Sequence, residues 1–178
     1  MKIGIELNGT VFDILRAAED YFGEPQQYGV STFDELYPMI SDLDLLAWKG
    51  SKHTYEKMPI VDGAFAAIDE LSQFHDLEGI TLTEKHLMTT VANLVLKNNL
   101  ALACIRHTRN KDITARQYKI DIFIESSASD ARRMAEICKT IILDSPYNRF
   151  GAGPDVIRAY SWQEVLGIIN GQNKSTQY

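Results

Sequence analysis

The chain has 178 residues, of which 45% are hydrophobic and 24% are charged, and these values are ordinary for a globular protein of one domain. Its formal net charge of −6 argues against a non-specific nucleic-acid surface, because binding of that kind depends on Lys and Arg neutralising phosphates. No apolar run approaches the roughly 18 residues of a membrane span, and the amino terminus lacks the features of a secretory signal. We therefore expect a cytoplasmic protein with no nucleic-acid or membrane partner.

Short apolar segments alternate with amphipathic segments along most of the chain. The apolar segments have the length of buried strands, and the amphipathic ones carry apolar residues three and four positions apart, as on one face of a helix. The predicted strands are residues 2–6, 77–82, 100–105, 121–125 and 139–143. The predicted helices are residues 63–74, 86–97, 129–138 and 161–169. This alternation predicts an α/β fold, a Rossmann-like three-layer arrangement around a parallel five-stranded sheet.

Residues 11–60 interrupt this alternation. The segment is long, partly helical and rich in aromatic residues. We interpret it as a small helical cap inserted after strand 1, which leaves residues 1–10 and 61–171 to form the core domain. An ordinary helical layer on the sheet is the alternative interpretation. The polar residues 172–178 are predicted to be a disordered tail.

Cysteine and histidine residues give no sign of a metal centre. Cys104 and Cys138 lie in apolar segments without a Cys-x-x-Cys or Cys/His pattern, which predicts buried free thiols. The four histidines also lack the spacing of metal ligands.

Polar residues stand where three of the predicted strands end, and ligands of open parallel sheets bind just beyond these ends. They are Glu6, Thr83 and Glu125. Ordinary structural interpretations also exist, because Glu6 and Asn8 can be turn residues and Thr83 can cap a helix. Lys111 ends a basic run that in isolation is typical of a solvated loop.

Four motifs occur along the chain in a specific order. Glu6-Leu7-Asn8-Gly9-Thr10 follows the first strand, Thr83-Glu84 follows the second, Lys111 precedes a helix, and Glu125-Ser126 ends an apolar strand. This order resembles the haloacid dehalogenase (HAD) superfamily, whose first motif is Asp-x-Asp-Gly-Thr and whose fourth is a pair of acids. The segments MPIVDGA (58–64) and DSPYNR (144–149) resemble its 5′(3′)-deoxyribonucleotidase-like branch more narrowly.

The resemblance implies roles for these residues. In enzymes of the family the first Asp attacks phosphorus and the second transfers protons, so Glu6 and Asn8 hold the catalytic positions. The implied phosphate site consists of Gly9, Thr10, Thr83, Glu84 and Lys111. The implied Mg²⁺ site consists of Glu6, Asn8, Glu125 and Ser126.

The reactive positions themselves depart from the family pattern. Glu6 is one methylene longer than Asp, which shifts its oxygens by about 1.5 Å, and misplacement of that order can cost ~10²-fold in rate. The amide of Asn8 cannot exchange protons as a carboxyl does, and loss of a general acid or base typically costs roughly 10²–10⁴-fold. Ser126 removes a negative charge, so Mg²⁺ binding is expected to be weak.

Three functional interpretations remain open. The first is a degenerate HAD-like, nucleotidase-like protein with impaired phosphatase chemistry that binds a phosphate-containing small molecule or nucleotide, or a protein partner. The second is an active Mg²⁺-dependent 5′-nucleotidase that uses Glu6 in place of Asp. The third is a structural interaction protein with no ligand in the cleft.

Overall fold

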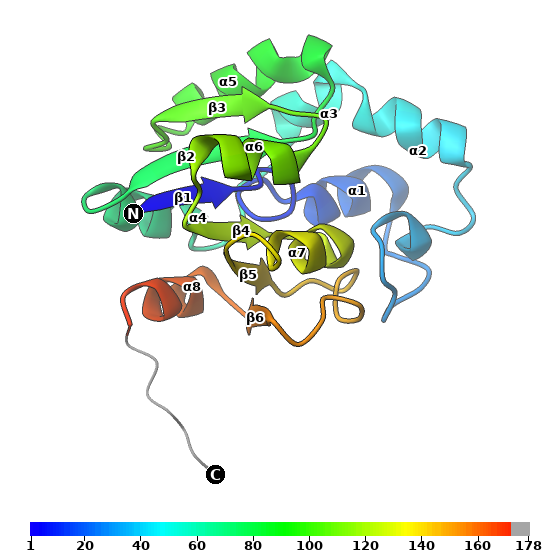
Figure 1. Cartoon of the computed structure of the whole chain (residues 1–178). Coiled ribbons are helices and arrows are strands. Elements are labelled where there is room, and N and C mark those ends of the chain that lie inside the picture. Colours follow the sequence, from blue (N-terminus) through cyan, green and yellow to red (C-terminus); the bar gives the residue numbers. More distant parts are fainter. Residues whose placement is uncertain (172–178) are drawn as a thin grey trace.

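A computed structural model of the chain describes residues 1–171. The strands of these residues form a single parallel sheet with the order β3-β2-β1-β4-β5-β6 (Figure 1). Their bounds are β1 Lys2–Ile5, β2 Asp76–Thr81, β3 Cys104–His107, β4 Ile122–Glu125, β5 Lys139–Leu143 and β6 Val156–Ala159. The predicted α/β fold with a parallel sheet is confirmed, and the sheet has six strands where the sequence predicts five.

Helices follow most of the strands. The α-helices are α1 Ile14–Phe22, α2 Asp42–Lys49, α3 Lys52–Lys57, α4 Ala64–Ser72, α5 Met88–Lys97, α6 Lys111–Tyr118, α7 Ala128–Met134 and α8 Trp162–Ile169. Two short 3-10 helices span Asp34–Leu36 and Lys85–Leu87. Ser161 caps α8, because its side chain accepts a hydrogen bond from the backbone N–H of Glu164.

Alternate residues of β4 show why the sheet is the middle of three layers. Ile122 and Ile124 point into the main hydrophobic core, to which α4, α5 and α8 contribute their apolar faces. Phe123 points the opposite way and packs with apolar residues of α6 and α7. Side chains of a strand alternate between the two faces, so a strand buried on both faces is apolar throughout.

Three predicted elements need correction. The strand predicted at 100–105 begins only at Cys104, because Leu100 is buried in the main core while still in the preceding loop. The missed strand β6 is an edge strand with three half-buried residues, and it contains Arg158, so it lacks a continuous apolar pattern. Helix α7 ends at Met134, and the chain turns there because the N–H groups of Ile137 and Cys138 donate to the Met134 carbonyl.

The segment between β1 and α4 contains α1, α2, α3 and one 3-10 helix, and it has a small hydrophobic cluster of its own. Its two connections to the sheet lie side by side, since Phe12 pairs with Ile60 in an antiparallel bridge and the Val61 N–H donates to the Val11 carbonyl at 2.9 Å. This pairing supports the interpretation of residues 11–60 as an insertion, although the exact bounds stay a prediction.

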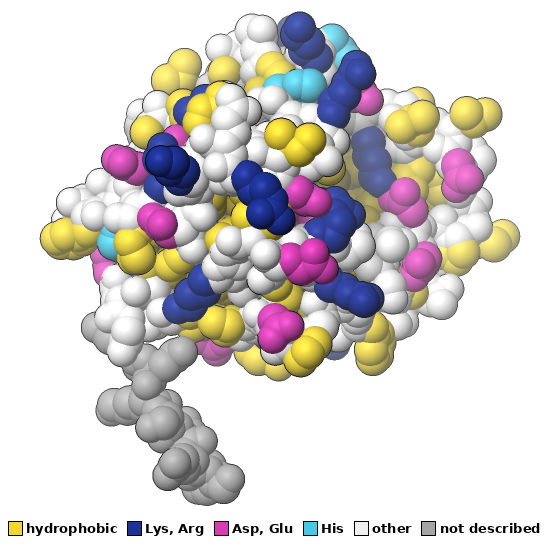
Figure 2. All heavy atoms as spheres, viewed as in Figure 1, with side chains coloured by type: hydrophobic (Ala, Val, Ile, Leu, Met, Phe, Trp, Pro, Cys, Tyr) yellow, Lys and Arg dark blue, Asp and Glu magenta, His cyan; other side chains and the backbone are white. Residues whose placement is uncertain are grey.

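Four further expectations concern membrane-spanning helices, surface charge, the two cysteines and the residues after 171. No helix within residues 1–171 combines the length and the apolar composition needed to cross a membrane. Basic and acidic side chains are intermixed on the face shown in Figure 2. Cys104 and Cys138 are free, and each is half-buried rather than fully buried. The predicted disordered tail, residues 172–178, lies outside the described residues.

Gly4 provides a test of the packing between β1 and the α6/α7 face. A methyl group at this position would lie 2.7 Å from the nearest carbon of the Phe123 ring, so Gly4→Ala should reduce the free energy of unfolding by about 1–3 kcal/mol. The control is Gly167→Ala in α8, where an added methyl group meets no atom within 4 Å and should stabilise the helix by about 0.5–1 kcal/mol. Urea unfolding of both variants measures the difference, and equal effects would contradict the packing described here.

Candidate functional site

The site lies where the chain leaves the two central strands. β1 and β4 are neighbours, but β2 and β3 extend the sheet on one side while β5 and β6 extend it on the other. Glu6 directly follows β1, and Glu125 is the last residue of β4. Both carboxylates therefore lie at the topological switch point of the sheet, where open α/β folds bind their ligands.

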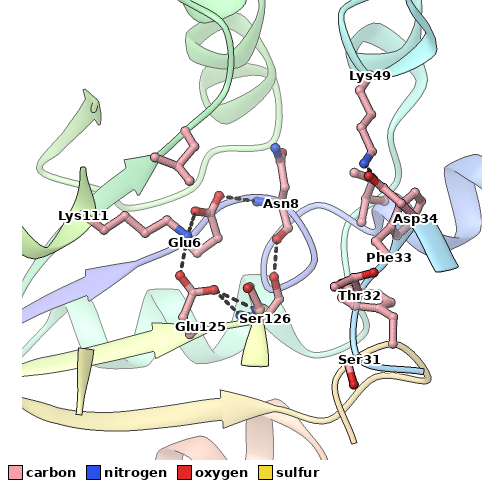
Figure 3. A pocket seen from close by; sticks show the side chains of 14 residues that line it. Glu6, Asn8, Ser31, Thr32, Phe33, Asp34, Lys49, Lys111, Glu125 and Ser126 are labelled. Atoms are coloured by element: carbon pink, nitrogen blue, oxygen red, sulfur yellow. Dashed lines mark hydrogen bonds and ion pairs between the residues drawn. The ribbon is translucent and has the colours of Figure 1, made fainter. Parts of the chain in front are cut away.

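Lys111 is the first residue of α6, and its side chain is almost completely buried between these carboxylates. The Lys111 Nζ lies 2.5 Å from Glu6 Oε2 and also contacts Glu125 Oε1 (Figure 3). It lies 2.9 Å from Asp130 Oδ2 as well. Burial by itself lowers the pKa of Lys111, but the three carboxylates outweigh it and hold the pKa above its ordinary value. Lys111 is therefore a charged ammonium at neutral pH.

The Glu6 side chain folds back over its own loop. Its Oε1 accepts hydrogen bonds from the backbone N–H groups of Leu7 at 3.0 Å and Asn8 at 3.1 Å, and from the Thr81 hydroxyl at 3.0 Å. Its Oε2 faces the Lys111 ammonium. The carboxylate is thus surrounded by four donors of the chain, a set in which two backbone amides, a hydroxyl and an ammonium point at one anion.

Glu125 is fully buried and is also tied to its own loop. Its Oε2 accepts hydrogen bonds from the N–H groups of Ser126 at 2.7 Å and Ser127 at 2.8 Å. Burial raises the pKa of Glu125 to about 7, with Glu6 and Asp130 adding to the increase and Lys111 opposing it. Three carboxylates share one ammonium here, so Glu125 carries a proton over much of the range below neutrality.

Asn8 links the core to the cap. Its Nδ2 donates to the Tyr55 hydroxyl of α3 at 3.1 Å and to the Thr83 hydroxyl at 3.0 Å, while its Oδ1 is buried without a partner among the described residues. Its backbone carbonyl accepts a hydrogen bond from the Ser126 hydroxyl at 2.7 Å. The Asn8 side-chain nitrogen and backbone carbonyl are therefore engaged in internal contacts, whereas the side-chain oxygen is not.

The other residues predicted for a phosphate site have different surroundings. Gly9 adopts φ +82°, and a methyl group there would lie 2.2 Å from the Tyr147 hydroxyl oxygen, so only glycine fits. The Thr10 hydroxyl donates to the Glu6 carbonyl and supports the loop. Glu84 is exposed, precedes a short 3-10 helix and does not line the cleft.

Two residues of the site were not predicted from the sequence. Asp130 lies in α7 and contacts Lys111, and Thr81 ends β2 and donates to Glu6. Each had a possible signal, since Asp130 is the next acid after Glu125 along the chain and Thr81 stands two residues before Thr83. Choosing between neighbouring threonines requires the register of β2, which the sequence pattern does not fix to one residue.

A cleft of about 330 Å³ lies between this cluster and the cap. Residues 31–34 and Lys49 form its cap side, and Figure 3 shows them opposite Glu6, Asn8 and Ser126. Lys49 pairs with Asp34 and lies 4.9 Å from the centre of the Phe33 ring, so its charge is also balanced within the protein. The cleft walls thus combine apolar and aromatic surface with a floor of paired charges.

The residues implied for Mg²⁺ do not fit that ion in this arrangement. In both Glu6 and Glu125, one carboxylate oxygen accepts backbone hydrogen bonds and the other faces the Lys111 ammonium. Ser126 presents its hydroxyl to the Asn8 carbonyl as a donor, whereas a metal site needs acceptor oxygens directed at the ion. No group of three or more His, Cys, Asp or Glu residues among residues 1–171 is arranged to hold a metal ion.

The pKa of Glu125 leads to a prediction for stability. Because folding raises this pKa from 4.5 to about 7, the folded state binds the proton more tightly than the unfolded state. The resulting contribution to stability is complete below the unfolded pKa and is lost as the pH rises through 7. Glu125→Gln should be less stable than the wild type, because an amide cannot accept from two N–H groups and from Lys111 at once, yet this pH-dependent component should be absent.

Urea unfolding between about pH 5 and pH 8 checks this expectation. The control is Glu84→Gln, which changes an exposed acid and should keep the wild-type pH profile. Parallel profiles for the wild type and Glu125→Gln would show that Glu125 does not titrate in this range.

Comparison with known proteins gives relatives in sequence and in fold. No protein-family model matches the chain. The chain is 31% identical to a nucleotidase of Clostridium acetobutylicum over 108 residues, which are 59% of this chain and 56% of that protein. It is 28% identical over 183 residues to a nucleotidase-like protein of Halalkalibacterium halodurans, covering 95% of this chain and 92% of that protein. The chain thus spans little more than half of the Clostridium protein and nearly all of the second.

Solved structures show the same architecture at low sequence identity. A haloacid dehalogenase-like hydrolase of Streptococcus pneumoniae has a TM-score of 0.62 and 13% identity, covering 94% of this chain and 97% of that chain. A haloacid dehalogenase hydrolase of Bacillus subtilis, solved with bound magnesium, has a TM-score of 0.62 and 15% identity, covering 95% of this chain and 98% of that chain. The resemblance predicted from the motifs is confirmed: the chain has the haloacid dehalogenase-like fold, and it is similar in sequence to a nucleotidase and to a nucleotidase-like protein.

Proposed function

We propose that this protein is a nucleotidase-like member of its fold that no longer transfers phosphoryl groups and acts by binding a ligand in the cleft. The observation that carries the proposal is the position of the Glu6 carboxylate. It takes the two backbone amides, the Thr81 hydroxyl and the Lys111 ammonium that together could hold an anion. The protein therefore supplies its own anion to the place where a phosphate group would be expected to bind.

The same contacts weaken Glu6 as a nucleophile. A carboxylate attacks through a free oxygen, and hydrogen bonds or an ion pair to that oxygen stabilise the ground state and lower its reactivity. Glu6 Oε1 accepts from three groups, and Glu6 Oε2 faces an ammonium at 2.5 Å. Asn8 has no proton to exchange with a leaving group. The nucleophile position, Glu6, and the acid/base position, Asn8, are therefore impaired for different reasons.

The cleft itself remains suited to a nucleotide-like ligand. Phe33, Ile14 and Leu82 offer aromatic and apolar surface, and Ser127 and Thr32 offer hydroxyl groups. Such a combination suits the base and sugar of a nucleoside. A phosphate group, in contrast, would have to displace Glu6 from its four donors. We therefore propose that the nucleoside portion of the ligand supplies most of the affinity.

Hydrolysis provides the first test. With MgCl₂ present, the wild type should hydrolyse 4-nitrophenyl phosphate and nucleoside monophosphates at near-background rates. Glu6→Asp alone should change little, because residues that act as a unit give non-additive effects. Glu6→Asp with Asn8→Asp should raise turnover at least about tenfold, toward the roughly 10²–10⁴-fold that a general acid or base supplies.

The structure can accommodate an Asp at position 8 in this double variant. The Tyr55 and Thr83 hydroxyls that now accept from Asn8 can rotate and donate to an Asp at the same place. The control is Glu84→Asp, which changes an exposed acid outside the cleft. Robust turnover by the wild type that disappears in Glu6→Ala would overturn the proposal and establish the alternative of an active nucleotidase.

Anion binding provides the second test. Glu6→Ala removes the internal anion and leaves the Leu7 and Asn8 amides, the Thr81 hydroxyl and part of the Lys111 charge free to bind another. Calorimetric titration with inorganic phosphate or tungstate should show at least about tenfold tighter binding than in the wild type, one factor of ten being about 1.4 kcal/mol. Glu84→Ala serves as the control and should behave as the wild type.

The wild type should in turn bind a nucleoside at least as tightly as its monophosphate. If the wild type binds phosphate as tightly as Glu6→Ala does, Glu6 does not occupy the anion site and this account of the cleft is wrong. If neither nucleosides nor anions bind to any of these proteins, ligand binding is excluded for this panel and the protein-partner interpretation gains support.

A further inference from the structure

We infer that the Lys111 ammonium is the resident cation of this site and that the native protein binds no divalent metal ion there. Lys111 Nζ contacts one carboxylate from the loop after β1, one from β4 and one from α7. These are the strand ends and the helix that surround the switch point. A single buried ammonium thus takes the central position among anions that a metal ion would otherwise draw together.

Each carboxylate oxygen of the cluster already has a donor from the chain. Three of the six oxygens face the Lys111 ammonium, and the other three accept from backbone N–H groups, a hydroxyl or a guanidinium. The donors to these other three are the Leu7 and Asn8 amides and the Thr81 hydroxyl for Glu6, the Ser126 and Ser127 amides for Glu125, and the Arg133 guanidinium at 2.7 Å for Asp130. A metal ion that bound here would have to break contacts to several of these donors.

Ser126 affects one further oxygen of the site, the backbone carbonyl oxygen of Asn8. The Asn8 carbonyl accepts a hydrogen bond from the Ser126 hydroxyl at 2.7 Å. An acidic side chain at position 126 would place acceptor oxygens beside that carbonyl, which is an arrangement that attracts a cation. The Ser126 hydroxyl instead donates a hydrogen bond that occupies one lone pair of this carbonyl oxygen. Ser126, like Lys111, therefore disfavours the binding of a metal ion at this site.

Charge balance supports the inference without a metal ion. Lys111 contacts all three carboxylates of the cluster and Arg133 pairs with Asp130, so two cations of the chain face these three acids. Mg²⁺ keeps much of its hydration shell and needs near-octahedral oxygen geometry at about 2.1 Å. Entry of a doubly charged ion beside a buried ammonium would add like-charge repulsion at short range.

The inference concerns metal binding and is independent of whether a phosphomonoester is turned over. The direct experiment titrates the full chain, first treated with a chelator, with MnCl₂ followed by electron paramagnetic resonance, and with MgCl₂ followed by thermal unfolding. The wild type should show no saturable binding and no shift of the unfolding midpoint. The matched variants are Lys111→Met and Lys52→Met, which each remove one ammonium while keeping most of the side-chain length.

The two variants should differ. Lys111→Met leaves three carboxylates without their shared cation, so it should unfold at a lower temperature in chelator, and Mn²⁺ should bind at least about tenfold more tightly than to the wild type and raise the midpoint. Lys52→Met should behave as the wild type, because Lys52 pairs with Glu56 on the exposed surface of α3, outside the cleft. If Lys111→Met folds but gains no metal affinity, Lys111 is not what excludes the ion and the inference fails.

The wild type decides the matter even if Lys111→Met does not fold. Saturable binding of one Mn²⁺ per wild-type chain, lost in Glu125→Gln, would place a metal in this site and overturn the inference. That result without hydrolysis would leave the proposed function in place. Hydrolysis by a wild type that binds no metal would instead overturn the proposed function and leave this inference intact.

Discussion

One buried ammonium organises the centre of this protein. Lys111 brings together Glu6, Glu125 and Asp130, which come from the loop after β1, from the end of β4 and from α7. Taking such charges out of water is costly, and the cost is recovered only when each is well paired. Removal of one partner from a buried ion pair typically costs about 3–5 kcal/mol, because an uncompensated charge remains. The fold therefore depends on having all four residues at once.

The loop after β1 extends this dependence to the cap. Glu6 fixes the amides of Leu7 and Asn8, and Asn8 in turn donates to Tyr55 of α3 and to Thr83 beyond β2. Hydrogen bonds of Glu6 and Asn8 thus connect the charge cluster to α3. Connected polar networks of this kind favour one arrangement of their members, since each bond orients the next group.

The sequence was sufficient for the class of fold and for most of the residues at its switch point. Glu6 and Glu125 were predicted because the end of a short apolar strand is visible in a single sequence, whereas Asn8 and Lys111 were assigned to the site by the resemblance to the haloacid dehalogenase superfamily. The interactions of these residues were not predictable. Whether Glu6 extends into the cleft or folds onto its own loop depends on the Thr81 hydroxyl and the Lys111 ammonium, which are 75 and 105 positions away in the chain.

The displaced strand β3 shows the same limit. Leu100 is as apolar as a strand residue and is buried, but it belongs to the turn before β3. Arg106 lies inside β3, where its guanidinium pairs with Glu78 and stacks on Tyr118 at 3.6 Å from the ring centre. A charged residue whose ion-pair partner lies on a neighbouring strand resembles a loop residue in the sequence, because that partner is not close to it along the chain.

The three departures from the family motifs are mutually consistent in space. Glu6 has the length to reach the Leu7 and Asn8 amides while its second oxygen contacts Lys111. Asn8 supplies donors to two hydroxyl oxygens, which an ionised Asp could not do. Ser126 donates to the Asn8 carbonyl, where an Asp would place a second anion beside an acceptor. Each substitution turns an interaction available to an external ligand into one satisfied inside the protein. The polar groups of Glu6, Asn8 and Ser126 are thus mostly paired inside the protein, and Asn8 Oδ1 is their one buried side-chain atom without a partner among residues 1–171.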